Sequence, residues 1–122
     1  MKSYTDIEQS KVLSKILSLE SADMFYRTDG SVKLMWEHLK DIPLTTPCCS
    51  LSALLGLMPF HIIENNNRFK FYQVKGFNKQ GETYRFGYKT NYPSFLFETS
   101  WYNNVVDAAF EMICWLKENE KI

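Results

Sequence analysis

The sequence predicts an α+β fold, with an antiparallel sheet of about four to five strands and about three helices packed on one face. Three observations support this class. Two pairs of short apolar runs flank turn residues as in hairpins, one further apolar run follows them, and the last segment has apolar residues at helical spacing. Because 122 residues fit one compact core, we expect a single domain over residues 1–122.

The first segment predicts a helix over residues 6–19. Thr5 and Glu8 have the spacing of a capping box, in which each side chain hydrogen-bonds to the backbone of the other residue. Four apolar residues then recur at the spacing of one helix face, and the opposite face is polar. These residues are Val12, Leu13, Ile16 and Leu17.

The second segment predicts a hairpin. Residues 24–28 and 32–36 are short apolar runs that suit strands. Between them, Asp29-Gly30 favours the positive φ angles of a two-residue turn. Residues 37–46 show no clear period, so we expect a connection there.

A short second helix is expected from Ser50 to Met58, because Pro59 ends it. Its apolar side chains point in nearly all directions, which is typical of a buried helix. Ser52 and Gly56 form a row of small residues that would let a neighbouring backbone approach closely.

The C-terminal half predicts a second hairpin, one further strand and a helix. The hairpin strands cover residues 69–75 and 82–89, around a loop that contains two glycines. The strand Phe95–Glu98 follows. Asn104 is the expected N-cap of the last helix, which has a long apolar face and runs to about Asn119.

The net charge of zero hides a basic central region. The chain has 14 Lys and Arg and 14 Asp and Glu residues, which removes the simplest argument for a nucleic-acid or anionic-membrane partner. Between Ile62 and Thr90, however, six residues are positive and two are negative. A basic strand surface with a tyrosine among its cations could follow a phosphate backbone or stack bases. The candidate nucleic-acid-binding residues are Arg68, Lys70, Tyr72, Arg85 and Lys89.

The same hairpin also fits a half-buried sheet without a ligand. Tyr84, Phe86 and Tyr88 alternate with Arg85 and Lys89, so the aromatic residues would pack beneath helices while the cations face solvent. Sheets that bind nucleic acid carry aromatic residues and cations on one exposed face, whereas here most aromatic residues oppose the cations. We therefore expect the half-buried sheet and keep single-stranded nucleic-acid binding as the alternative function.

Cysteine and histidine offer a second alternative, a cysteine-dependent enzyme. Cys48 or Cys49 could be a nucleophile with His38 or His61 as its base, since the pair precedes a helix N-terminus that would lower a thiol pKa. The sequence has no glycine motif for an oxyanion site, and its Cys and His spacing fits no zinc site. With Cys114 the cysteine count is odd, so reduced thiols are expected. We expect neither a metal nor a cofactor.

Recognition of a partner is the remaining class of function. Trp36, Trp101 and Tyr102 are candidate interface residues, because interfaces favour large aromatic side chains with a polar tip. Trp115 shares the apolar last helix, so we expect it in the core. A homodimer through an edge strand or an aromatic patch is a further expectation.

The sequence predicts a cytoplasmic protein. Its first ten residues lack the apolar core of a signal peptide. Residues 42–60 carry no charge, but prolines and hydroxyl side chains interrupt this stretch and argue against a membrane span.

Three phrases of the sequence resemble one family. They are Ser-Ala-Asp-Met at residues 21–24, Pro-Cys-Cys-Ser-Leu-Ser-Ala-Leu at 47–54 with Met58-Pro59, and Asp-Ala-Ala-Phe-Glu-Met at 107–112. The chain is similar in these phrases to a family of short uncharacterised proteins, a domain of unknown function, from gut bacteria and their phages or mobile elements. In that family a Trp often follows the Pro-Cys, so Cys49 departs from the pattern. The resemblance implies a small accessory protein, of the kind that a prophage carries, that binds another macromolecule.

Together these observations favour a non-enzymatic cytoplasmic protein-interaction or accessory module. The expected partner is another protein or a second copy of the chain, with nucleic acid as the alternative and no membrane.

Overall fold

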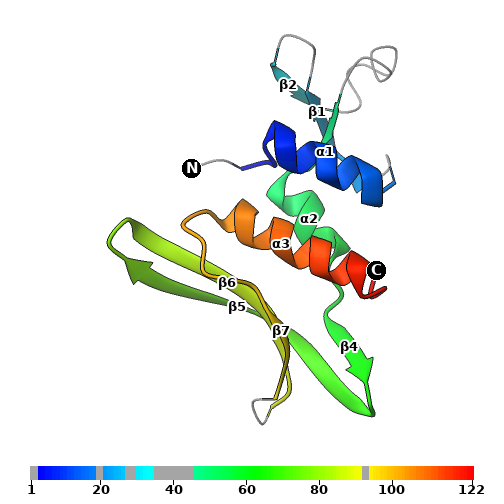
Figure 1. Ribbon diagram of the computed structural model, residues 1–122, viewed down its shortest axis with the longest axis vertical. Helices are drawn as coiled ribbons and strands as arrows, with labels where there is room; N and C mark the ends of the chain where they lie inside the picture. Colours follow the sequence, from blue (N-terminus) through cyan, green and yellow to red (C-terminus); the bar gives the residue numbers. More distant parts are fainter. Residues whose placement is uncertain (1–2, 19–20, 27–29, 35–45, 92–93) are drawn as a thin grey trace. The chain divides into compact units, whose positions relative to one another are not determined.

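The structure, a computed structural model of the chain, describes residues 3–18, 21–26, 30–34, 46–91 and 94–122. They form two compact units, Met1–Leu57 and Met58–Ile122. Three helices and two antiparallel sheets lie in these residues, which confirms the α+β class (Figure 1). The sheets have three and four strands, in place of the single sheet that we expected. A single domain over residues 1–122 stays a prediction.

The N-terminal unit contains two helices and a sheet of three short strands in the order β2-β1-β3. In chain order its elements are α1 (Ile7–Ile16), β1 (Met24–Tyr26), β2 (Val32–Leu34), β3 (Thr46–Cys48) and α2 (Leu51–Leu57). The sequence did not predict β3, because its central residue is a proline. Proline has no backbone N–H to donate to a neighbouring strand. It is tolerated in β3 because this strand lies at the edge of the described sheet and has a neighbour on one side only.

The N-cap of α1 is Asp6, one residue after the predicted Thr5. The Asp6 carboxylate accepts a hydrogen bond from the backbone N–H of Gln9 at 2.7 Å, and the Gln9 side chain accepts one from the Asp6 N–H at 3.1 Å. Thr5 is fully buried, and its hydroxyl lies 2.8 Å from that of Ser10. The helix ends at Ile16, short of the predicted residue 19.

The first hairpin is confirmed, with a register that differs by one residue. A two-residue turn at Asp29-Gly30 would place Tyr26 opposite Lys33, but Tyr26 pairs with Val32. Gly30 has a positive φ of 87°, as expected of a turn glycine. The rest of the expected turn, including Asp29, lies outside the described residues.

The start of α2 is confirmed, but its burial is not. The Ser50 hydroxyl accepts a hydrogen bond from the N–H of Ala53 at 3.2 Å, as an N-cap does. Leu54 is fully buried, whereas Ser52 and Gly56 are exposed, and no described atom lies within 4 Å of a Cβ built at Gly56. Apolar composition leads to burial only where a neighbour covers each side of the helix, and no described residue covers Gly56.

The C-terminal unit is a four-stranded sheet with one helix, in the strand order β4-β5-β6-β7. Its elements are β4 (His61–Glu64), β5 (Asn67–Asn78), β6 (Gly81–Lys89), β7 (Phe95–Glu98) and α3 (Val105–Glu118). The second hairpin, β7 and α3 are confirmed, and β4 is an additional strand. The side chain of Asn104 caps α3 by accepting the N–H of Val106 at 2.8 Å.

The two hairpin turns of this sheet are tight. Asn65 and Asn66 have φ of 52° and 66°, the two positive values of a type I′ turn between β4 and β5. Pairing of β5 with β6 continues to Asn78 opposite Gly81, where we expected a loop over residues 76–81. Gly81 supplies a φ of 117°, which a larger residue adopts only with strain.

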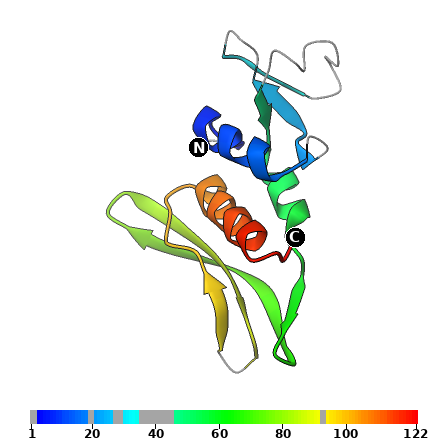
Figure 2. The same cartoon turned by 45° about the vertical axis from the view of Figure 1, so that its right-hand side comes forward.

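One face of the four-stranded sheet, called here the inner face, packs against α3 (Figures 1 and 2). The rings of Phe97 and Trp115 stack with their centroids 4.6 Å apart and an interplanar angle of 9°, which places Trp115 against the sheet as expected. Other inner-face and α3 side chains are buried. They are Phe69, Phe86, Tyr88, Ala109, Met112, Ile113 and Leu116.

Candidate functional site

The opposite face of the four-stranded sheet, called the outer face, brings the candidate nucleic-acid-binding residues together. Directly paired residues of an antiparallel sheet point to the same side. Lys70 pairs with Lys89. Two residues later on β5, Tyr72 pairs with Gly87, which lies two residues before Lys89 on β6. The outer-face residues of β5 and β6 are Arg68, Lys70, Tyr72, Val74, Gly76, Thr83, Arg85, Gly87 and Lys89.

Tyr72 lies flat across the sheet at the centre of an aromatic and charged cluster. Its ring covers Gly87, and a Cβ at that position would overlap the ring. The Nζ atom of Lys89 lies 4.6 Å from the ring centroid, and the ring of Phe95 is 6.2 Å away. The Tyr72 hydroxyl donates a hydrogen bond to the carboxylate of Glu98, which fixes the ring on this face.

Trp101 forms a second aromatic position on the outer face. Its ring lies over Gly76, where a Cβ would be 3.3 Å from the ring edge. The guanidinium carbon of Arg85 lies 4.7 Å from the ring, and the same guanidinium is 3.7 Å from Glu98. The Trp101 side chain is 43% exposed, so part of the ring surface faces solvent.

The charge of the outer face is positive. Arg68, Lys70 and Lys89 are exposed, and none of them forms an ion pair with a described residue. The Glu98 carboxylate is engaged by Arg85 and by the hydroxyl of Tyr72. The buried Nε atom of Arg85 has no hydrogen-bond partner among the described residues. This face therefore offers free cationic groups beside exposed rings.

The pKa shifts of the tyrosines show which hydroxyls are held as donors. Burial, together with the hydrogen bond to Glu98, raises the pKa of Tyr72 well above its usual value. Burial and Glu111 raise the pKa of Tyr102 to about 12, and its hydroxyl donates to Glu111 at 2.5 Å. Tyr102 is half-buried and bonded within the unit, which makes it a weaker interface candidate than Trp101. Trp36 lies outside the described residues.

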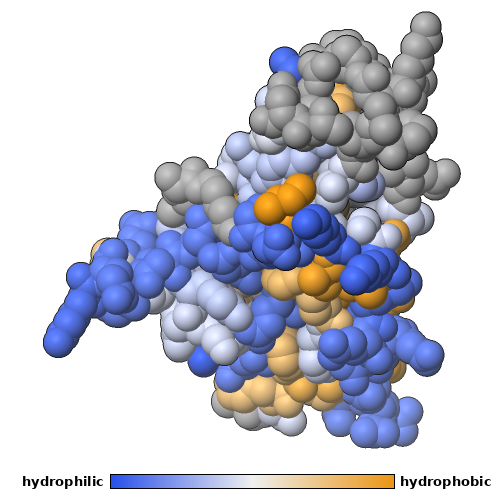
Figure 3. Space-filling model, turned by 45° about the horizontal axis from the view of Figure 1, so that its top comes forward, coloured by the Kyte–Doolittle hydropathy of each residue, from blue (hydrophilic) through white to orange (hydrophobic). Residues whose placement is uncertain are grey.

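Two hollows lie at the ends of the outer face. One, of about 360 Å³, is lined by Lys70, Phe71, Tyr72, Lys89, Thr90 and Asn91. The other, of about 290 Å³, is lined by Gly76, Phe77, Asn78, Thr83 and Trp101. The hairpin tip beyond the second hollow is largely hydrophilic (Figure 3). Each hollow combines an aromatic ring with polar groups, as small-ligand sites do.

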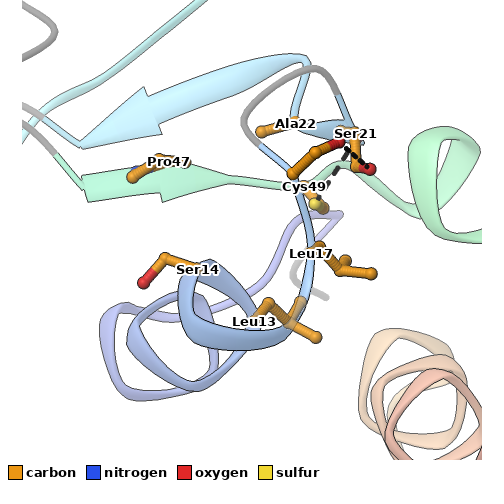
Figure 4. A pocket seen from close by; sticks show the side chains of 8 residues that line it. Leu13, Ser14, Leu17, Ser21, Ala22, Pro47 and Cys49 are labelled. Atoms are coloured by element: carbon orange, nitrogen blue, oxygen red, sulfur yellow. Dashed lines mark hydrogen bonds between the residues drawn. The ribbon is translucent and has the colours of Figure 1, made fainter. Parts of the chain in front are cut away.

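The cysteine site of the N-terminal unit is closed. Cys49 lines a pocket of about 10 Å³ with Leu13, Leu17 and Ser21, which is room for about one water molecule (Figure 4). Its thiol donates to the Ser21 carbonyl at 3.8 Å. Burial raises the pKa of Cys49 to about 12, so the nucleophilic thiolate is disfavoured.

Cys48 is also held inside the N-terminal unit. Its sulfur is 3.6 Å from the Thr5 hydroxyl and 3.4 Å from the Thr5 carbonyl, and burial raises its pKa. The described hydrogen bonds of both thiols are with residues of the N-terminal unit. His61 is exposed on β4 of the other unit, and His38 lies outside the described residues. The described residues of the N-terminal unit therefore contain no histidine that could pair with either thiol.

Three residues of the outer-face cluster escaped the sequence reasoning. Phe95, Gly87 and Glu98 each contact Tyr72. A glycine between two aromatic residues of a strand was the available signal for Gly87, because such a glycine marks the close approach of another group. Phe95 carried no signal, since its side depends on a register shift between β6 and β7.

Comparison with known proteins finds no matching family model, no matching curated protein and no matching solved structure. The resemblance to the family from gut bacteria and mobile elements therefore stays a prediction. In the described residues, no helix is both long and apolar enough to cross a membrane. The same residues contain no group of three or more His, Cys, Asp or Glu side chains placed to hold a metal ion.

Proposed function

We propose that the protein binds single-stranded nucleic acid on the outer face of its four-stranded sheet. The observation that carries the proposal is that aromatic rings and unpaired cations share this one face. Tyr72, Phe95 and Trp101 offer rings on which unpaired bases stack. Lys70 and Lys89 lie beside Tyr72 and Phe95 and can neutralise phosphates.

The two faces of the sheet explain why a protein with zero net charge can have this role. The inner face is packed against α3 as the sequence predicted, with Phe86 and Tyr88 fully buried. The outer face carries its own aromatic residues, so the objection that aromatic residues oppose the cations applies to only one set of rings. Stacking on a ring does not require a particular base, which favours binding with little sequence preference.

A direct test is the binding of fluorescent single-stranded RNA and DNA at low salt, measured by anisotropy. Lys89→Glu removes the cation above Tyr72 and should weaken binding by about tenfold or more. Lys117→Glu is the matched control, because Lys117 is an exposed lysine on α3, the helix on the opposite face. Absence of binding at low salt, or equal losses in the two variants, would overturn the proposal.

The protein-interaction module that the sequence favoured stays a prediction, and the same experiment separates it from the proposal. An acidic polypeptide such as polyglutamate has the charge of a nucleic acid without its bases. Polyglutamate should compete weakly, because it cannot stack on Tyr72 or Trp101. If it binds as tightly as the oligonucleotide, and Tyr72→Ala changes neither affinity, the outer face recognises acidic proteins instead.

A further inference from the structure

We infer that the outer face holds a nucleic-acid strand at two separate stacking subsites, one at Tyr72 and Phe95 and one at Trp101. This inference rests on the proposed function and specifies the ligand, a single strand of several nucleotides instead of a free nucleotide. Two observations support this inference: the two hollows, and the separation along β5 between Tyr72 and Gly76, the residue beneath Trp101.

The first subsite is fixed in place before any ligand arrives. Tyr72 is held from below by Gly87 and at its hydroxyl by Glu98. The Nζ atom of Lys89 lies over the Tyr72 ring, 4.6 Å from its centroid, and the centroid of the Phe95 ring is 6.2 Å away. A base that enters the adjoining hollow of about 360 Å³ meets a ring for stacking and an ammonium group for its phosphate.

The second subsite is built in the same way from different residues. Trp101 lies against Gly76, and Arg85 covers part of its ring with a guanidinium group. The indole is 43% exposed, and it borders the hollow of about 290 Å³. The unpartnered Nε–H of Arg85 is a donor in the same cluster.

The distance between the subsites sets the length of the ligand. Tyr72 and Gly76, which lies beneath Trp101, are four residues apart on the same face of β5. At ~3.3 Å per residue this separation is about 13 Å. A stacked strand rises ~3.4 Å from one nucleotide to the next, so this separation is about four steps and about five nucleotides are needed to reach both rings. A mononucleotide can occupy only one subsite at a time.

Glu98 connects the two subsites. Its carboxylate accepts the hydroxyl of Tyr72 and lies 3.7 Å from the guanidinium of Arg85, which in turn covers Trp101. Glu98 is therefore a positioning residue, because a carboxylate repels phosphate and does not bind it.

The test is a length series of oligouridylates of one, two, four, six and eight nucleotides, followed by anisotropy or by quenching of tryptophan fluorescence. The wild-type affinity should rise by about tenfold between four and six nucleotides, as the second subsite is filled, and change little beyond that. Trp101→Ala should remove this step and leave dinucleotide binding unchanged. Phe60→Ala is the matched control, because Phe60 is an 80% exposed aromatic residue that lines neither hollow.

The outcomes separate this inference from the proposed function. If no oligonucleotide of any length binds at low salt, the proposed function itself is wrong. If oligonucleotides bind but affinity does not step up with length, or Trp101→Ala weakens every length equally, the two-subsite inference is wrong while nucleic-acid binding stands. If Phe60→Ala keeps the rise of affinity with length, the effect of Trp101→Ala is specific to the Trp101 ring. If Phe60→Ala also loses this rise, the inference is contradicted.

Discussion

The cysteine site of the N-terminal unit and the outer face of the C-terminal unit have the right residue types for a function, but they differ in access. Cys48 and Cys49 are buried, and the pocket at Cys49 holds about 10 Å³. The outer face has two open hollows of about 360 and 290 Å³, and the exposed Lys70 and Lys89 line the larger one. Residue type suggests a chemistry, and accessibility decides whether a ligand can use it.

The largest expected effect concerns the reactivity of the buried thiols. With a pKa of about 12, Cys49 has about three-thousandfold less thiolate near neutral pH than a free cysteine of pKa ~8.5. We expect Cys48 and Cys49 to resist alkylation in the native protein and to react once it is unfolded, with the half-buried Cys114 labelled first. Peptide mass spectrometry after timed alkylation measures this order. Rapid native labelling of Cys48 or Cys49 at pH 7 would reopen the thiol-enzyme alternative.

The next effect separates the two faces of the four-stranded sheet. Phe86→Ala removes a fully buried ring and should lower the free energy of unfolding by about 3–5 kcal/mol. Phe95→Ala removes a ring that is 50% exposed on the outer face and should cost less than about 1.5 kcal/mol. Urea unfolding monitored by circular dichroism gives both values. Equal losses would mean that Phe95 belongs to the core and is not available for stacking.

A smaller effect tests how Tyr72 is held. Gly87→Ala places a methyl group where the Tyr72 ring lies, so the ring must move and lose its hydrogen bond to Glu98. We expect a stability loss of about 1–3 kcal/mol and a loss of oligonucleotide affinity similar to that of Tyr72→Ala. Gly56→Ala is the control, because no described atom lies within 4 Å of its Cβ and a helix favours Ala over Gly by about 0.5–1 kcal/mol. Full affinity in Gly87→Ala would show that the resting position of Tyr72 is not required.

A further expected effect is a loss of stability at alkaline pH in both units. Burial raises the pKa of Tyr26 in the N-terminal unit and of Tyr102 in the C-terminal unit to about 12. An unfolded tyrosine ionises near pH ~10, so the unfolded state releases its protons first. The free energy of unfolding should therefore be unaffected by these groups below pH 10 and fall between pH 10 and 12. Denaturant midpoints across this range measure the fall, which Tyr102→Phe should reduce; a flat profile would contradict the assignment.

Local sequence signals predicted the elements whose residues carry their own pattern. The alternation of Tyr84, Phe86 and Tyr88 identified the inner side of β6, and Asn104 marked the start of α3. Local sequence signals did not predict strands whose formation depends on pairing with a neighbouring strand. β3 contains a proline that only an edge position tolerates, and β4 is only four residues long.

The composition of the outer face could be predicted only in part. The alternation of side chains along the strands predicted that Tyr72 shares a face with the cations of β5 and β6, and the strand pairing in the structure puts them on one face. Phe95 joins them because the register shifts at Tyr88 and Lys89, which no single strand reveals. Trp101 lies outside the regular strands, and its place over Gly76 depends on the path of the chain after β7.

The salt dependence of oligonucleotide binding tests the central claim most directly. For single strands, the slope of log K against log salt concentration is about −0.7 per phosphate neutralised. The account predicts tight binding at low salt, a negative slope of several phosphate contacts, and a slope shallower by about 0.7 or more in Lys70→Glu but not in Lys117→Glu. Binding that is absent at low salt, or a slope that Lys70→Glu leaves unchanged, would contradict a nucleic-acid site on the outer face.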